Sequence, residues 1–151
     1  MPVRIAKTTD LPTLIGVGSE YIELMQGSQT VDVLTLTGNV RNAIESPFEE
    51  LFVYEDDTGL QGFLWATYGA ALPWTPSVQA YDRMLFLKES GRSFVAVASL
   101  VRAYLDWAKG KGCTEASLSS ISGIQPERTR KLFNKLGFSD VGFYNTKKLG
   151  G

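Results

Sequence analysis

The sequence predicts an α/β (α+β) protein in which a mixed central β-sheet is flanked by helices, in the order β-α-α-β-β-β-α-β-α-β. Hydrophobic residues make up 44% of the 151 residues, which is enough to bury a core in one domain spanning residues 1–151. Short runs of β-branched and aromatic residues alternate with turn residues, as in strands. Other segments place apolar residues three and four apart, as in helices. Strands first follow one another and then alternate with helices, so a mixed sheet is expected.

The N-terminal part predicts one strand and two helices. Residues 3–6 are a short strand, and Asp10 is expected to cap the next helix by accepting backbone N–H bonds with its carboxylate. A second, weaker helix is predicted over residues 30–46, where Gly38 interrupts the pattern. The apolar stripe of the first helix comprises Leu14, Ile15, Val17, Tyr21, Ile22 and Met25.

The middle of the chain predicts three consecutive strands. Residues 51–54 form a strand by their aromatic and β-branched content, and the turn at residues 56–59 suits a hairpin. The partner strand runs over residues 60–68. Two prolines mark a loop at residues 73–76, and a further strand ends at residues 84–87.

The C-terminal part alternates helices and strands. Residues 93–109 are the clearest helix, and residues 113–118 are a strand that should run parallel to the strand before this helix. Pro126 begins another helix, which Gly137 ends. A last strand is predicted over residues 141–148. The stripe of the long helix comprises Val97, Leu100, Val101, Tyr104, Leu105 and Ala108.

Composition excludes several chemistries. Histidine is absent and cysteine occurs once, as Cys113, so Ser-His-Asp triads, Cys-His dyads and His- or Cys-ligated metal sites are excluded, and no metal is expected. Cys113 is interpreted as a packed thiol. No apolar run approaches the roughly 20 residues that span a bilayer, and the N-terminus lacks a signal-peptide pattern. We therefore expect a cytoplasmic location (host cytoplasm or virion for a phage protein) and no membrane partner.

Charge is divided unevenly along the chain. Residues 1–87 carry 4 basic and 11 acidic side chains, whereas residues 88–151 carry 11 basic and 5 acidic ones. The second part therefore suggests an anionic ligand, although attraction between two halves of one domain would give the same pattern.

The segment around Arg92 is a candidate phosphate site. A turn with Gly91, Arg92 and Ser93 leads directly into the long helix, where free backbone N–H groups and the helix dipole favour an anion. The alternative is a plain strand-to-helix connection with a solvated arginine.

Two motifs in the second half resemble the GNAT family of acyl-CoA-dependent N-acyltransferases. Residues 92–97 (RSFVAV) match the family's R/Q-x-x-G-x-G/A in the arginine, although valine stands at both glycine positions. Residues 125–138 resemble the family's N-x-x-A-x-x-L-Y-x-K-L-G-F helix and turn. The helix between these motifs is also similar, and the overall style resembles small GNAT-like proteins of bacteriophages.

This resemblance implies the fold, acetyl-CoA or CoA as co-substrate and a set of binding residues. A strand end would pair its backbone with the pantetheine arm, and the turn and helix start would hold the pyrophosphate. Valine keeps its backbone N–H, so phosphate binding survives the loss of glycine if the side chains point away. The expected CoA-binding residues are Leu85, Phe86, Leu87, Arg92, Ser93, Phe94, Val95, Ala96, Val97, Arg128 and Phe133.

The resemblance also implies direct attack of an amine on the thioester, with a general base and a general acid. Asp82 and Glu55 are the candidate bases, and the alternative for each is a solvated carboxylate. Phe133 stands where the family often has the tyrosine that acts as general acid. The general acid is therefore either absent or supplied by another residue. Tyr144 is the candidate substitute, with Tyr104 and Tyr68 behind it, although each also suits packing.

Three hypotheses follow. The first is an N-acyltransferase acting on an amine of a small molecule or a protein; the acidic first half favours a cationic amine. The second is a structural or interaction protein with this fold, for instance a phage virion component, with a second copy of the chain or virion proteins as partners. The third is acyl transfer onto a nucleobase, although the net charge of −1 argues against nucleic acid as a partner.

Overall fold

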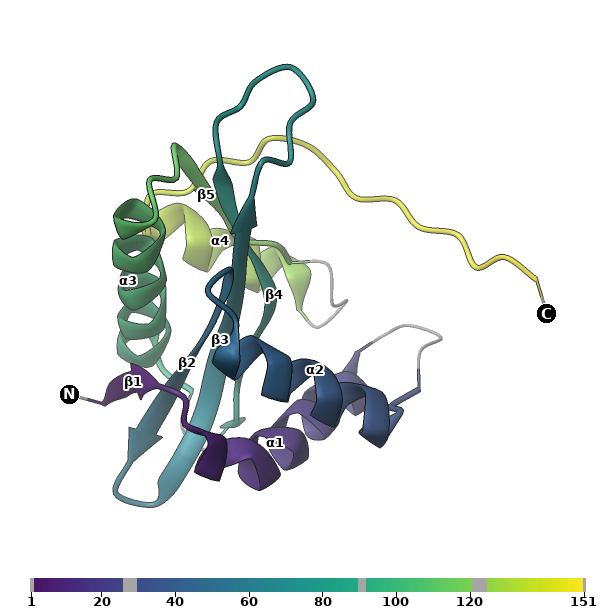
Figure 1. Cartoon of the computed structure of the whole chain (residues 1–151), viewed down its shortest axis with the longest axis vertical. Coiled ribbons are helices and arrows are strands. Elements are labelled where there is room, and N and C mark those ends of the chain that lie inside the picture. Colours follow the sequence, from purple (N-terminus) through teal and green to yellow (C-terminus); the bar gives the residue numbers. More distant parts are fainter. Residues whose placement is uncertain (1, 26–29, 90–91, 121–124, 151) are drawn as a thin grey trace.

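The computed structural model describes residues 2–25, 30–89, 92–120 and 125–150, and these contain one five-stranded sheet (Figure 1). The strands lie in the order of the chain. Neighbouring strands are antiparallel except for the last pair, which is parallel, so the mixed sheet is confirmed. The strands are β1 (Val3–Ile5), β2 (Glu49–Asp56), β3 (Gly59–Gly69), β4 (Gln79–Leu87) and β5 (Glu115–Ser117).

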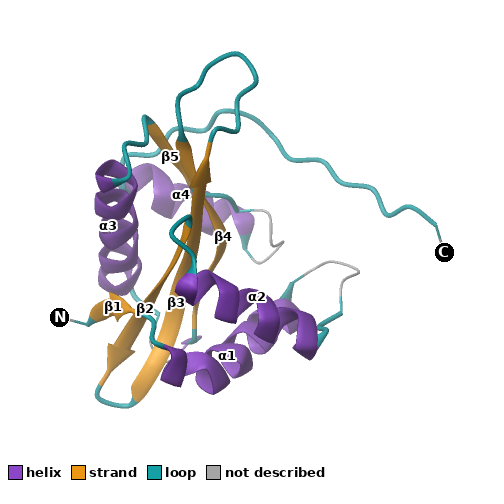
Figure 2. Ribbon diagram, viewed as in Figure 1, coloured by secondary structure: helices purple, strands orange, loops and turns teal. Residues whose placement is uncertain are grey.

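Helices cover both faces of the sheet. Figure 2 shows α1 and α2 on one face and α3 and α4 on the other, in agreement with two separate clusters of buried apolar side chains. No helix in the described ranges is long and apolar enough to cross a membrane. The helices are the short 3-10 helix η1 (Thr8–Asp10), α1 (Leu11–Leu24), α2 (Val33–Glu45), α3 (Phe94–Gly110) and α4 (Pro126–Lys135).

The central strand β3 supplies both cores. Phe63 and Trp65 pack with α1 and α2, whereas Leu64 and Ala66 pack with α3. Successive side chains of a strand point to opposite faces, so a strand covered on both sides is apolar throughout rather than alternating. This explains the near-continuous apolar run from Leu60 to Ala66.

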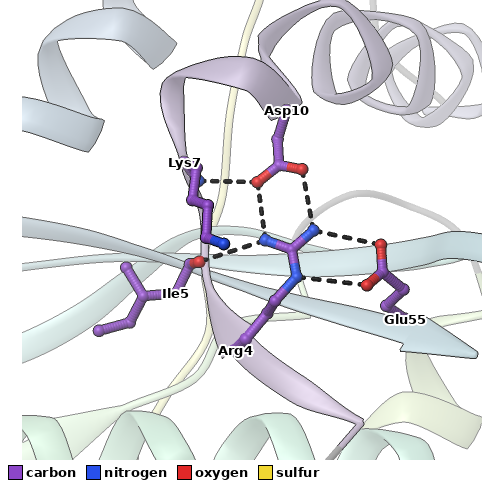
Figure 3. Close-up of polar contacts among 5 residues, drawn as sticks. All are labelled: Arg4, Ile5, Lys7, Asp10 and Glu55. Atoms are coloured by element: carbon purple, nitrogen blue, oxygen red, sulfur yellow. Dashed lines mark hydrogen bonds and ion pairs between the residues drawn. The ribbon is translucent and has the colours of Figure 1, made fainter.

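An ion cluster fastens the N-terminal strand to the body (Figure 3). The Arg4 guanidinium donates to both oxygens of Asp10, at 2.8 and 2.9 Å, and to both oxygens of Glu55, at 3.1 and 3.3 Å. Asp10 also accepts the backbone N–H of Lys7 at 2.7 Å. These bonds to Arg4 lower the pKa of the Asp10 carboxyl below its usual value. Asp10 does precede α1, but the prediction that its carboxylate caps this helix is wrong, because Arg4 and Lys7 use that carboxylate instead.

The prediction of a last strand over residues 141–148 is wrong. After Asp140, which Arg130 holds at 2.8 Å, the chain runs away from the body in an extended path that pairs with none of the described strands (Figure 1). Val141 and Phe143 are each 98% exposed. Valine and aromatic residues favour a strand only where a partner strand and a packed face exist, and here the segment has neither within the described residues.

The β4–α3–β5 unit is the predicted parallel crossover, and its strands separate early. The parallel pairing joins only Gln79, Ala80 and Tyr81 of β4 to residues of β5. Beyond this point β4 continues to Leu87 with β3 as its sole described partner. The sheet therefore has a free strand edge in its interior, on the side from which β5 departs.

Gly62 allows the end of β4 to lie close against β3. A Cβ atom at residue 62 would collide with the backbone oxygen of Phe86 and would lie 2.8 Å from the Cα of Leu87. Both neighbours are backbone atoms, so they cannot rotate away as a side chain could.

We predict that Gly62→Ala lowers the free energy of unfolding by about 2 kcal/mol or more, because the new methyl group must displace a β-strand. Gly38→Ala is the matched control: it lies inside α2 with no atom near the added methyl group, and alanine is the better helix former by up to about 1 kcal/mol. Urea unfolding measures both variants. Equal effects in the two would contradict this account.

Candidate functional site

A cavity of about 910 Å³ opens where β5 separates from β4. Its walls come from β4, the C-terminal end of α1, the start of α3, the segment that follows β5, and α4. The volume lies at the upper end of the range of small-molecule sites, about 300–1,000 Å³. Because α1 lies on one face of the sheet and α3 and α4 on the other, the cavity reaches both faces through the gap beside β4.

Within the described residues, the edge of β4 that faces this gap has no partner strand beyond Tyr81. The N–H of Lys88 donates to the oxygen of Gln61 on β3, at 2.8 Å. Pairing groups alternate along an antiparallel strand, so Leu85 and Leu87 direct their N–H and C=O groups to the opposite, open edge. The oxygen of Leu87 confirms this orientation, because it accepts the guanidinium of Arg92 at 3.0 Å.

A β-bulge in β4 places Asp82 and Met84, which are two residues apart, on different faces of the sheet. Trp65 pairs with Met84 and Ala66 with Asp82, so Arg83 is an extra residue on β4. Met84 consequently lies on the α1 face, whereas Asp82 lies on the α3 face next to Tyr104. Bulges re-aim side chains in this manner at the edges of binding sites.

Asp82 sits at the point where the two strands diverge. One oxygen of its carboxylate accepts the backbone N–H of Ser119 at 3.0 Å and the Ser119 hydroxyl at 3.2 Å. Burial raises the pKa of Asp82 to about 6, although the two bonds from Ser119 partly oppose the shift. The group is therefore mostly ionised at neutral pH and yet takes up a proton readily, as a general base does.

The first turn of α3 lies at one end of the cavity. The Ser93 hydroxyl caps the helix by accepting the N–H of Ala96 at 3.0 Å. The N–H groups of Phe94 and Val95 have no hydrogen bond within the described residues. Together with the helix dipole they favour an anion.

The cavity has two unlike ends. Four cationic side chains gather where α3 and α4 line it, namely Arg92, Arg128, Lys131 and Lys135. Where α1 lines it, the wall is mainly apolar: Tyr21, Ile22 and Met25 face Met84 and Phe86, and the rings of Tyr21 and Phe86 lie 5.1 Å apart.

Solved structures share this architecture. Aminoglycoside 6'-N-acetyltransferase AAC(6')-IG from Acinetobacter haemolyticus is 15% identical with a TM-score of 0.75, covering 99% of this chain and 100% of its own. AAC(6')-Iy, solved with the bisubstrate analogue CoA-S-monomethyl-acetylneamine, is 20% identical with a TM-score of 0.72, covering 97% of each chain. A predicted acetyltransferase from Clostridium acetobutylicum, solved with acetyl-CoA, is 13% identical with a TM-score of 0.77, covering 97% of this chain and 94% of its own.

The chain has the GNAT fold. At these identities the likeness establishes the fold alone. No protein-family model matches the sequence, and no curated protein matches it either.

Most residues expected at a GNAT CoA site line this cavity. They come from β4, the start of α3 and α4, which are far apart in the sequence, and the fold brings them together. Those that line it are Leu85, Phe86, Leu87, Arg92, Ser93, Phe94, Val97, Arg128 and Phe133, and Asp82, the candidate general base, lines it as well. Their roles stay predictions.

The two valines that replace the GNAT glycines have different positions. Val95 is 69% exposed, whereas Ala96 is fully buried on the core-facing side of α3. Neither residue lines the cavity. Val97 is buried in the α3 core and borders the cavity. The side chain of Val95 therefore does not occupy the space in front of the helix start.

Two expected catalytic residues lie elsewhere. Glu55 is held by Arg4 at the other end of the sheet, and Tyr144 lies in the extended C-terminal segment. The structure brings neither to the cavity.

The other tyrosines are engaged in packing. Tyr104 is buried, its hydroxyl donates to the oxygen of Ser117 at 2.8 Å, and burial raises its pKa. The ring of Tyr68 packs edge-on against Trp107.

Cys113 is half-buried against the α3 core, and burial raises its pKa, which suits a packed thiol. Within the described residues, no group of three or more acidic or cysteine side chains could hold a metal ion.

Sequence reasoning missed part of the lining. Tyr21 and Met25 occur at helical spacing and were assigned to the core of α1, whereas both also face the cavity. Ser119 and Ser120 follow β5, and no sequence pattern marks them. The last parallel pair joins Tyr81 to Ser117, and Ser119, two residues further along the chain, bonds to Asp82.

We predict that Asp82→Asn stabilises the protein at pH 8 by about 1–3 kcal/mol and leaves its stability little changed at pH 4. The folded-state pKa of about 6 lies above the usual unfolded value of about 3.9, so burying the carboxylate costs stability above pH 6. This cost fades as the pH falls and the carboxyl takes up a proton. Urea unfolding at several pH values measures the difference.

Asp106→Asn, at an exposed position of α3, is the matched control and should show no such pH-dependent gain. An Asp82→Asn protein that is less stable than wild type at pH 8 would contradict the assigned cost of the buried carboxylate.

Proposed function

We propose that the chain is a GNAT-family N-acyltransferase in which residues 1–151 form one catalytic domain and acetyl-CoA donates the acyl group to an amine. The observation that carries this proposal is the cavity beside the free edge of β4, with cationic side chains and a helix start at one end and Asp82 in its lining. The fold, which is that of acetyltransferases solved with acetyl-CoA and with a CoA bisubstrate analogue, supports it.

The chemistry of the cavity fits CoA. CoA carries a diphosphate and a further phosphate, which suit Arg92, Arg128 and the N–H group of Phe94. Its pantetheine arm carries two amides, which suit the N–H and C=O groups of Leu85 and the N–H group of Leu87; the Leu87 oxygen already accepts Arg92. Such pairing adds a short strand to an exposed sheet edge. Phe133 supplies an apolar contact.

Asp82 is the proposed general base. When an amine attacks the thioester carbonyl carbon, the new C–N bond forms, the C–S bond breaks and the amine loses a proton. A carboxylate with a pKa near 6 can accept that proton near neutral pH, and the Ser119 hydrogen bonds hold it in place.

The departing thiolate does not require a tyrosine. A thiol has a pKa near 8.5, so water can protonate the sulfur at neutral pH. Phenylalanine at residue 133 is therefore compatible with turnover. The competing hypothesis of a structural protein expects a loop or a partner to fill the cleft and no release of CoA thiol with any amine.

We predict that acetyl-CoA binds and that Arg128→Ala weakens its binding about five- to tenfold, because a charged hydrogen bond to phosphate is lost. Arg102→Ala, an exposed arginine of α3 outside the cavity, is the matched control and should bind as wild type does. Isothermal titration calorimetry measures both, and primary amines should then release CoA thiol. The absence of acetyl-CoA binding at millimolar ligand would overturn the proposal.

A further inference from the structure

The apolar end of the cavity indicates which amines it accepts. Tyr21, Ile22 and Met25 are half-buried at the end of α1, and they line the cavity together with Met84 and Phe86. The contact between the Tyr21 and Phe86 rings, at 5.1 Å and 35°, makes this a preformed aromatic wall. A substrate lying here exchanges water for apolar surface.

Charge at this end is sparse. Asp82 is the sole carboxylate among the described residues that line the cavity. Arg83 is the nearest cation of the same strand, and it is engaged with Glu49 at 3.2 Å and with the face of the Trp65 ring. One carboxylate can balance one ammonium group. A second ammonium would lose water beside apolar side chains with no described carboxylate to pair with.

The negative charge of the first half of the chain is not gathered here. Eleven acidic residues lie within residues 1–87, and of these Asp82 alone lines the cavity. Glu20 and Glu23 belong to α1 but do not line the cavity. The overall acidity of this half therefore gives no affinity for polycations within the site.

We propose that the acyl acceptor is a primary monoamine with an aromatic or aliphatic body, and that polyamines and aminoglycosides are poor acceptors. This rests on the proposed function and sharpens the expectation of a cationic amine to a single positive charge. The ammonium group lies toward Asp82 and the body lies against the wall formed by Tyr21, Met25 and Phe86.

The test is the binding of three amines to the protein, alone and saturated with CoA, by calorimetry. We expect 2-phenylethylamine to bind at least about tenfold more tightly than 1,5-diaminopentane or neamine, because a phenyl group gains more from an apolar wall. Acetyl-CoA assays should give the same order in kcat/KM. A diamine or neamine that binds as tightly, or no amine binding at 10 mM, would overturn the inference.

A variant of Met25 tests whether the charge of the apolar wall sets the preference between monoamines and diamines. Met25→Glu adds a carboxylate at the apolar end and should shift the ratio of diamine to phenylethylamine binding about threefold toward the diamine. Leu24→Glu is the matched control. Leu24 directly precedes Met25 at the end of α1, and its side chain is exposed and does not line the cavity. An equal shift in both variants would overturn the assignment of this wall.

Failure of this inference differs from failure of the proposed function. If acetyl-CoA binds and turns over but polyamines are preferred, the acceptor class alone is wrong. If acetyl-CoA does not bind, the acyltransferase proposal is wrong, and amine binding to the protein alone still decides what the apolar end recognises.

Discussion

The separation of β5 from β4 is the constraint on which the rest of this structure depends. The two strands pair through Gln79, Ala80 and Tyr81, after which β4 continues beside β3 alone. The lost pairing leaves backbone donors and acceptors exposed inside the sheet, where the α3 crossover and α4 form walls around them. Backbone groups without a partner strand favour hydrogen bonds of the kind that an extended, amide-bearing molecule would supply.

The bulge at Arg83 determines how the two faces of the sheet share the cavity. Without the extra residue, Asp82 and Met84 would point to the same face. With it, the carboxylate joins the α3 face beside Tyr104 and Met84 joins the apolar wall of α1. One irregular residue thus gives the cavity a titrating carboxylate on one face of the sheet and an apolar side chain on the other. The pKa of about 6 at Asp82 follows from its burial where β4 and β5 separate.

Much of the fold was predictable because its elements carry local patterns. The stripe of α3 and the turn at residues 56–59 identified the long helix and the central hairpin, and both are confirmed. Asp10 was mispredicted, because its partner Arg4 lies on another element and no local pattern announces that pair. The segment over residues 141–148 was mispredicted for the same reason: strand propensity does not reveal whether a partner strand exists.

The site was predictable in part for a related reason. Arg92, Arg128 and Phe133 came from motifs with fixed spacing, and all three line the cavity. Tyr21 and Met25 also line the cavity, but no motif predicted this. Apolar residues at helical spacing indicate burial without telling whether the side chains face the core or a cavity. Glu55 was chosen by its place at a strand end, which does not tell which end of the sheet holds the cleft.

Amide hydrogen exchange of Leu85 tests the central claim most directly. If the open edge of β4 holds the pantetheine arm, saturating CoA should slow exchange at Leu85 by about tenfold or more, and much less at Val3 on the distant edge strand β1. Exchange at Leu85 that is unchanged by CoA, or slowed no more than at Val3, would show that the free edge of β4 is not where CoA binds.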